Sequence, residues 1–309
     1  MTDARSDRNL ILSADATAAR LPWPALVREI EAVATDAAVR VPERIVMPTA
    51  AGAVLFVMPA SDGRTAMTKL ITLTPGTSAG PLPVIPGDVL VFDVASGERR
   101  LVLDGPTVTG RRTAAVSALA ARLLAPEPQG PMLIVGAGVQ GRAHLEVFAS
   151  VLGVRRFVIA ARRRDSALAL VRQARALGLD ASAVDDADAA LDDCPLVAAC
   201  TPARQVVLHA QPRRDAFVAA VGAFAPDMAE VAPSVCRHFA AQGHVVLDAV
   251  DAEAEAGDLL QAGVPVRGLP TLATLLRGAP IGAGPVLFNN CGWAGWDLAA
   301  ARLALRTRR

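Results

Sequence analysis

The sequence predicts an α/β protein in which a doubly wound parallel sheet is joined to a smaller α+β domain. The first observation is an apolar run, Met132–Val135, that ends in a glycine-rich turn and is followed at once by a helix-like stretch, Val139–Leu152. The second is the alternation of apolar runs with helical segments in the central part of the chain. The third is a series of strand-like segments separated by Gly, Pro and Ser turns in the first part.

Residues 118–289 are assigned to the doubly wound domain. Its expected strands are Met132–Val135, Arg156–Ala160, Leu196–Cys200, Ala216–Val221 and His244–Leu247. The segments between them, such as Ser166–Leu177, are rich in alanine and place apolar residues at helical spacing. Strands that alternate with helices in this way form a parallel sheet that is covered on both faces.

Residues 1–117 and 290–309 are assigned to the α+β domain. A helix, Pro24–Val39, precedes the strand-like segments, and Gly97 and Gly105 mark further turns. The segments are Ile45–Pro48, Ala53–Met58, Ala66–Leu73 and Asp88–Asp93. Because glycine and proline turns separate them closely, an antiparallel sheet is expected.

Two further helices link the domains. The first, Thr113–Ala125, ends at Pro126 and Pro128 and is expected to connect the two. The second is the tail, Gly295–Arg308, whose apolar residues recur at helical spacing. We expect this tail to return to the first domain.

Composition and charge exclude several classes of protein. The 309 residues are 52% hydrophobic and 20% charged, as expected for a globular chain with a large core. The net charge of +1 argues against nucleic acid or a membrane surface as partner. The polar start leads into only three strongly apolar residues, Leu10–Leu12, so no signal peptide or transmembrane span is expected and a cytoplasmic location is the default.

No metal site is expected. The four cysteines, Cys194, Cys200, Cys236 and Cys291, form no C-x-x-C pair and are interpreted as buried thiols. The histidines are scattered, and the position of His144 on the helix after the glycine turn favours packing or a contact on the phosphate side over catalysis.

The glycine-rich turn is the most informative feature of the sequence. Gly136, Gly138 and Gly141 complete a G-x-G-x-x-G pattern between a strand and a helix, which is the context of a dinucleotide site in a Rossmann-type domain. The first glycine allows the tight turn, the second lets the backbone approach a pyrophosphate, and the third lets helix and strand pack closely. The helix N-terminus then faces the phosphates. A nicotinamide- or flavin-dependent protein is the leading interpretation.

The residues after the second strand favour NADP(H) over NAD(H). An NAD site has an acidic residue about 20 residues past the glycines, but here alanine is followed by Arg162, Arg163 and Arg164. Their guanidinium groups suit a 2′-phosphate, although a solvated loop is the alternative interpretation. Asp165 is the best counterexample, and we expect it to cap the next helix, so NAD(H) stays possible. The residues expected to hold the cofactor are Gly136, Ala137, Gly138, Val139, Gln140, Gly141, Arg162, Arg163 and Thr201.

Three basic residues lie in unusual surroundings ahead of the glycine turn. Arg44 stands at the mouth of a strand, Lys69 lies inside an otherwise apolar strand, and Arg112 comes just before an apolar helix. An isolated buried charge is costly, so Lys69 needs an anionic partner. Spacing alone favours a structural salt bridge for each residue and does not show that the three converge on one carboxylate.

The ordered motifs resemble those of the ornithine cyclodeaminase/μ-crystallin family over nearly the whole chain, from about Leu10 to Leu305. The stretch Arg112–Ala118, which reads Arg-Thr-Ala-Ala-Val-Ser-Ala, is specific because it stands immediately ahead of a dinucleotide loop. The other motifs are Pro42-x-Arg44, Met58-Pro59, Lys69, Leu90–Asp93, Gly136–Gly141 with His144 and Glu146, Val221–Met228, and Cys291–Ala294 with Asp297–Ala299.

The resemblance implies a homodimer whose first domain binds substrate and mediates dimerisation. It also implies that Arg44, Lys69 and Arg112 hold the carboxylate of the substrate. Activities in the family include ornithine and lysine cyclodeamination, alanine dehydrogenation, and reduction of cyclic imines such as Δ1-pyrroline-2-carboxylate and Δ1-piperideine-2-carboxylate.

Departures from the family pattern favour its ketimine reductase branch. Phe56 and Phe224 stand where the cyclodeaminases have a glutamate and an aspartate, and phenylalanine can neither bind an amine nor activate water. The segment Pro226–Met228 resembles the reductases. Asn289 and Asn290 stand where many members have Lys-Ser, and this departure gives no functional expectation.

The sequence therefore predicts NADPH-dependent reduction of a cyclic imino acid to proline or pipecolate. Lys69 is the candidate for protonating the imine, or else it serves as a point charge. Asp227 is expected to orient the imine nitrogen or to bind on the nicotinamide side, or instead to cap a turn. The alternatives are a deaminating enzyme, such as an ornithine cyclodeaminase or an alanine dehydrogenase, and a non-enzymatic NADP-dependent binding protein, because fold does not settle function.

Overall fold

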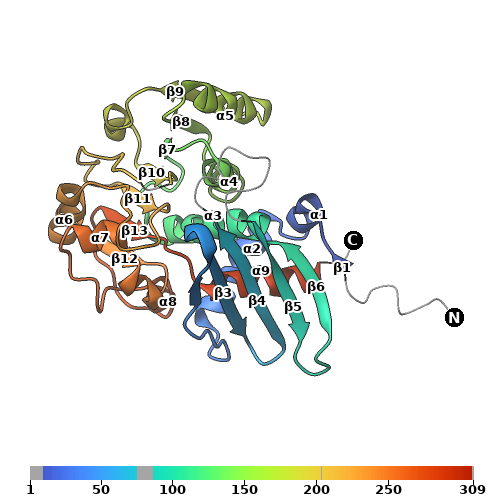
Figure 1. Cartoon of the computed structure of the whole chain (residues 1–309). Helices are drawn as coiled ribbons and strands as arrows, with labels where there is room; N and C mark the ends of the chain where they lie inside the picture. Colours follow the sequence, from blue (N-terminus) through green and yellow to red (C-terminus); the bar gives the residue numbers. More distant parts are fainter. Residues whose placement is uncertain (1–9, 75–85, 203, 308–309) are drawn as a thin grey trace. The chain divides into compact units, whose positions relative to one another are not determined.

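The computed structural model describes residues 10–74, 86–202 and 204–307, and the chain divides into two compact units. Unit 1 consists of Met1–Arg112 and Trp293–Arg309, and unit 2 consists of Thr113–Gly292. Within the described residues, unit 2 contains a seven-stranded parallel sheet and unit 1 a six-stranded, mostly antiparallel one (Figure 1). The α/β class predicted from the sequence is confirmed.

The sheet of unit 2 has the strand order β12-β13-β11-β10-β7-β8-β9. The strands are β7 (Met132–Val135), β8 (Arg156–Ala160), β9 (Asp180–Val184), β10 (Leu196–Ala199), β11 (Phe217–Ala220), β12 (His244–Leu247) and β13 (Val286–Asn289). Every residue of β7, β10, β11 and β13 is buried, because these strands are covered on both faces. The strand order reverses between β7 and β10, so a topological switch point lies at the carboxyl ends of these two strands.

The helices of unit 2 follow the expected alternation. They are α4 (Val139–Val147), which continues as a π-helical turn over Phe148–Leu152, α5 (Arg164–Ala176), α6 (Pro233–Gln242), α7 (Gly257–Gln261) and α8 (Leu272–Leu276). Short 3-10 turns lie at Asp188–Asp193 and Val250–Ala254. α5 buries one stripe of apolar residues and exposes the rest, as its period predicts.

The sheet of unit 1 has the order β1-β6-β5-β4-β3-β2, and only β1 and β6 pair in parallel. Its strands are β1 (Leu10–Ile11), β2 (Ile45–Pro48), β3 (Val54–Ser61), β4 (Thr65–Leu73), β5 (Gly87–Asp93) and β6 (Arg99–Asp104), with a 3-10 turn at Ala50–Gly52. The helices are α1 (Ala14–Ala19), α2 (Trp23–Thr35) and α9 (Ala294–Arg306). α9 packs against β3, β4, β5 and β6 and against α2, so the expected return of the tail to this part of the chain is confirmed.

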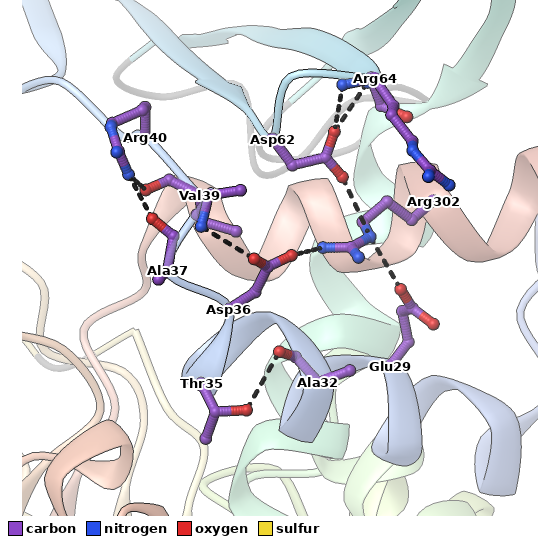
Figure 2. Close-up of polar contacts among 12 residues, drawn as sticks. Glu29, Ala32, Thr35, Asp36, Ala37, Val39, Arg40, Asp62, Arg64 and Arg302 are labelled. Atoms are coloured by element: carbon purple, nitrogen blue, oxygen red, sulfur yellow. Dashed lines mark hydrogen bonds and ion pairs between the residues drawn. The ribbon is translucent and has the colours of Figure 1, made fainter.

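Ion pairs fix α9 against α2 and the turn between β3 and β4. Arg302 on α9 contacts Glu29 (3.0 Å), Asp36 (3.0 Å) and Asp62 (3.2 Å), as Figure 2 shows. Arg306 also pairs with Glu29. Glu29 and Asp62 are largely buried, so these contacts keep two carboxylates from being isolated in the protein interior.

Two predicted helix boundaries were wrong. The connecting helix begins at Gly105, not Thr113, and α3 is Gly105–Leu124. Gly105 is therefore a helix residue and not a turn, because the Asp104 carboxylate accepts the N–H of Thr107 (2.8 Å) and caps the helix eight residues earlier. The helix expected over Pro24–Val39 ends at Thr35, where the Asp36 side chain instead accepts the N–H of Ala38.

None of the helices formed by the described residues is long and apolar enough to cross a membrane. The polar start of the chain and Arg308 of the predicted tail helix lie outside the described residues. All four cysteines are buried and free, as the sequence predicts.

Candidate active site

The glycine turn follows β7 at the switch point of the unit 2 sheet. Gly136 has φ +112° and its missing Cβ would lie 2.5 Å from the carbonyl oxygen of Cys200, so only glycine fits between β7 and β10. A Cβ on Gly141 would lie 1.9 Å from the oxygen of Gly136, which explains the close packing of α4 on the turn. A Cβ on Gly138 would meet nothing within 4 Å.

The open space beside Gly138, unlike the close contacts of Gly136 and Gly141, indicates the function of this glycine. Packing within the unit requires Gly136 and Gly141, but it leaves Gly138 facing open space. Gly138 is also the N-cap of α4 and offers no side-chain acceptor to the first turn, and Val139 beside it is 70% exposed. A helix N-terminus without a side-chain cap, a bare backbone and an exposed apolar residue fit a pyrophosphate and its nucleotide.

A chain of buried hydrogen bonds joins α4 to α3 through His144 and Ser117. His144 is fully buried; its Nδ1 lies 2.8 Å from the Gln140 carbonyl and its Nε2 lies 3.0 Å from Ser117 Oγ. Burial lowers the pKa of His144 to about 4, so the ring is neutral. A carbonyl only accepts, so Nδ1 carries the proton and Ser117 donates to Nε2. Asn290 completes the chain by donating to Ser117 Oγ (3.0 Å) and to the Thr113 carbonyl (3.1 Å).

The arginine run follows β8, the neighbour of β7. Arg162 and Arg163 are exposed there, and Arg163 donates to Ser166 Oγ at 3.0 Å. Arg164 pairs instead with Asp185 and begins α5. The expectation that Asp165 caps this helix was wrong: the N-cap is Arg163, and Asp165 lies within the first turn.

Thr201 follows β10 and is held by a carboxylate that the sequence did not indicate. Glu230 is fully buried and accepts the N–H of Thr201 (2.5 Å) and its hydroxyl (2.7 Å) at one oxygen. Its other oxygen accepts the N–H of Gly222 (2.5 Å) and of Val221 (3.2 Å). Burial raises the pKa of Glu230 to about 7, against the opposing effect of these donors. One side chain thus fixes the carboxyl ends of β10 and β11.

Two of the three basic residues, Lys69 and Arg112, contact one buried carboxylate, and the third, Arg44, interacts electrostatically with Lys69. Lys69 is 1% exposed, and its Nζ lies 2.8 Å from Oδ2 of Asp297 on α9. Arg112 is 5% exposed, and its Nε lies 3.2 Å from Oδ1 of the same residue. Arg44 is half-buried, with its guanidinium 6.0 Å from the centre of the Phe56 ring. We call Arg44, Lys69, Arg112 and Asp297 the cation cluster.

The cation cluster has an excess of positive charge and an unused donor. The cluster contains three cations and one carboxylate. Burial lowers the pKa of Lys69 to about 8, Arg112 and Arg44 act in the same direction, and Asp297 opposes them. Among the described residues, Nη1 of Arg112 is buried without a hydrogen-bond partner. A buried guanidinium N–H needs an acceptor, so the cluster fits a small anion such as a carboxylate.

The remaining predicted residues lie in other surroundings. Phe56 shares a face of the unit 1 sheet with Met58 and Lys69, which are opposite each other in β3 and β4. Asp227 lies in an exposed turn of unit 2, three residues after Phe224. Among the described residues, no group of three or more His, Cys, Asp or Glu side chains is arranged to hold a metal ion.

Sequence reasoning missed Asp297, Glu230 and the role of Asn290. Lys69 and its partner Asp297 are 228 residues apart in the sequence, so no local pattern joins them. One signal was present: of the 31 basic residues of the chain, Lys69 is the only lysine.

Comparison with known proteins decides the family. A model described as the ornithine cyclodeaminase/mu-crystallin family matches residues 18–303. The chain belongs to this family. This family member is 40% identical over 291 residues to Δ1-pyrroline-2-carboxylate reductase 2 of Burkholderia ambifaria, with 93% of this chain and 92% of that protein covered. It is 39% identical over 302 residues to the Δ1-pyrroline-2-carboxylate/Δ1-piperideine-2-carboxylate reductase of Azospirillum brasilense, at 95% and 94% coverage.

Solved structures show the same fold. The family member superposes with a TM-score of 0.88 on the Δ1-pyrroline-2-carboxylate reductase of Thermococcus litoralis, determined in complex with NADH and L-proline. The two chains are 22% identical, and 96% of each is covered. At that identity the comparison establishes the architecture, including the combination of the two units in one chain.

Proposed function

We propose that this chain is a nicotinamide-dependent reductase of cyclic imino acids, acting on Δ1-pyrroline-2-carboxylate and Δ1-piperideine-2-carboxylate. The observation that carries the proposal is the buried cation cluster with an unpaired Arg112 N–H, in a chain that also holds a dinucleotide turn. The names of the Burkholderia and Azospirillum relatives support the same reaction.

The cofactor site consists of the glycine turn and the residues that follow neighbouring strands. Gly136–Gly141 and the N-terminus of α4 would hold the pyrophosphate, and Thr201 lies at the carboxyl end of β10 beside the turn. Arg162 and Arg163 favour NADPH, because their guanidiniums are exposed where a ribose 2′-phosphate is expected. NADH is the alternative cofactor, as in the Thermococcus complex.

The substrate carboxylate would bind the cation cluster. Arg112 offers its free Nη1 N–H, Lys69 an ammonium and Arg44 a half-buried guanidinium. Phe56 supplies an apolar surface that suits the ring methylenes and disfavours a free side-chain ammonium. Phe224 likewise stands where a deaminase has a carboxylate that its reaction needs.

The reduced cofactor supplies a hydride, and the chain's own residues orient the imine and control its proton. Fixing the carboxylate sets the position of the adjacent imine carbon, C2. A protonated imine is the better hydride acceptor, and Lys69, with its lowered pKa, is a suitable proton donor near neutral pH. Addition of the hydride to C2 and retention of the proton on nitrogen give the cyclic amino acid. Asp227 stays a candidate for orienting the nitrogen.

The decisive assay follows NADPH absorbance with each imine against a blank without imine. Rapid oxidation with either substrate supports the proposal, and the ratio of rates gives the ring preference. Ammonia release from L-ornithine with catalytic NAD would instead indicate a deaminase. Tight NADPH binding without turnover of any imine would indicate a binding protein.

Substitution of Arg112 tests the substrate site. A charge-assisted hydrogen bond contributes about 1.5–3 kcal/mol, so Arg112→Ala should lower kcat/KM by about tenfold or more. An unchanged kcat/KM would show that the cation cluster does not bind the substrate.

Substitution of the arginine run tests the choice of cofactor. Arg162→Ala and Arg163→Ala should each lower the preference for NADPH over NADH, by about tenfold per lost contact. Arg164→Ala is the matched control, since Arg164 pairs with Asp185. Equal kcat/KM with both cofactors in the wild type would contradict the NADP assignment.

We also propose that two copies pair through the open face of the unit 1 sheet. Lys69 points to α9, so its neighbours in β4 point away from it. Ile45, Val57 and Leu70 are opposite one another in β2, β3 and β4, and Ile45 is 57% exposed. Such an apolar row is typical of a protein interface. Light scattering should give a dimer that Leu70→Glu converts to a monomer, while Leu177→Glu, an exposed site of unit 2, leaves the dimer intact.

We propose a cytoplasmic location, because the reaction consumes a reduced nicotinamide and the four cysteines are free thiols.

A further inference from the structure

The single lysine of this chain occupies a position that an arginine could not fill in the same way. Thirty of the 31 basic residues are arginine, and the remaining one, Lys69, is buried in the cation cluster. Arginine stays protonated at any ordinary pH, whereas an ammonium can lose its proton when it is buried. Among the 31 lysine and arginine side chains, Lys69 is therefore the one whose charge can change near neutrality.

The charge of Lys69 depends on the groups that face it. Asp297 comes from α9, Arg112 from α3 and Arg44 from the segment ahead of β2. Asp297 is the only one of the three that favours the ammonium form; both guanidiniums oppose it. Asp297 is fully buried, and each of its oxygens contacts one cation, Lys69 at 2.8 Å and Arg112 at 3.2 Å.

The position of Asp297 on its helix suits a fixed anion. It lies in the first turn of α9, where the helix dipole stabilises negative charge. Arg302, farther along α9, is held by carboxylates of α2 and of the β3–β4 turn, which fixes the helix that carries Asp297 (Figure 2).

We propose that Asp297 is a positioning residue that keeps Lys69 protonated and aims Arg112, so that α9 sets the upper pH limit for carboxylate binding. The inference rests on the proposed function for its kinetic consequence, since the bound carboxylate is that of the imino acid. Above the pKa of Lys69, which is about 8, the cluster loses one cation and binds the carboxylate more weakly. Without Asp297, burial and two guanidiniums would release the proton at a lower pH.

The single lysine makes the first test direct. In protein labelled with 13C and 15N only in lysine, and free of any tag, all side-chain lysine signals come from Lys69. The titration midpoint of its Cε resonance should lie near 8 in the wild type and fall by about one unit or more in Asp297→Asn. Asp36→Asn is the matched control, because it removes a carboxylate that pairs with α9 through Arg302 and should leave the midpoint unchanged. An Asp297→Asn midpoint equal to or above that of the wild type would overturn the proposal.

A second variant covers the case in which Asp297→Asn does not fold. Arg112→Gln removes a cation that lowers the pKa of Lys69 and leaves the carboxylate of Asp297 to Lys69 alone. The Lys69 midpoint should then rise. A midpoint that falls or stays the same contradicts the electrostatic coupling among the three residues.

The kinetic test separates positioning from a general loss of structure. The ratio of KM for the imine in Asp297→Asn to that in the wild type should be at least about fivefold larger at pH 8.5 than at pH 6, because Lys69 loses its proton at a lower pH in the variant. A merely structural defect would raise KM by the same factor at both pH values. If the wild type reduces no imine, the proposed function fails, and the lysine titration still decides the role of Asp297.

Discussion

Replacing Ser117 by alanine should destabilise unit 2 far more than an ordinary serine substitution. Ser117 is fully buried, and its hydroxyl is the only described partner of His144 Nε2 and one of two partners of the Asn290 amide nitrogen. Alanine leaves a buried acceptor and a buried donor without partners. Each such group costs about 1–3 kcal/mol. Because the Asn290 amide keeps its other bond, to the Thr113 carbonyl, the free energy of unfolding should fall by about 2–4 kcal/mol, the lower part of the summed range.

Thermal unfolding provides the assay. At about 2–4 °C per kcal/mol for a unit of this size, Ser117→Ala should lower Tm by roughly 5–15 °C. Ser182→Ala, at an exposed position of β9, is the matched control and should change stability by no more than about 0.5 kcal/mol. NMR of 15N-labelled histidine should show His144 with its proton on Nδ1. A Tm loss no larger than that of the control, or a proton on Nε2, would refute the hydrogen-bond chain.

Three further outcomes follow from the described contacts. Glu230→Gln should lower the free energy of unfolding by about 1–3 kcal/mol in urea at pH 8, because an amide nitrogen would then face two backbone N–H groups. An unchanged urea midpoint would contradict the hydrogen bonds that Glu230 accepts from Val221 and Gly222. The pKa of His144 falls from its ordinary value to about 4 on folding, so the contribution of His144 to stability is lost as pH falls. The difference in unfolding free energy between wild type and His144→Gln should therefore shrink by about 2 kcal/mol from pH 7 to pH 5. A constant difference would show that His144 does not titrate in this way. Arg302→Met should cost about 3 kcal/mol by leaving Glu29 and Asp62 poorly paired, and calorimetry showing no loss would mean that the ion pairs of Figure 2 contribute little.

The parts of the fold that depend on local pattern could be predicted from the sequence. β7, β8 and β12 begin and end at the residues predicted from the sequence, because a buried parallel strand needs a run of apolar residues that face both sides of the sheet. The glycine turn could also be predicted, since Gly136 and Gly141 are each required by close contacts within a few residues or at the neighbouring strand, and Gly138 completes the pattern between them.

The parts that depend on distant partners could not be predicted. β13 (Val286–Asn289) was not expected, because its apolar run is short and only its neighbours β11 and β12 make it a central strand. The clustering of Lys69 and Arg112 around Asp297 depends on α9 packing against β4, which spacing cannot show. β9 was missed because its alternating exposure, at the edge of the sheet, gives a weak signal.

The return of α9 to unit 1 also sets an order of events during synthesis. The strands of unit 1 are synthesised before unit 2, but α9, which covers them and pairs with Lys69, is synthesised after it. Unit 2 is continuous in sequence and can fold as soon as it has emerged. Unit 2 can therefore fold before α9 has been synthesised, while the sheet of unit 1 still lacks the helix that packs against it. A chain that ends before Asp297 leaves Lys69 without its counter-ion. Synthesis of the chain past Asp297 is therefore a condition for assembling the cation cluster.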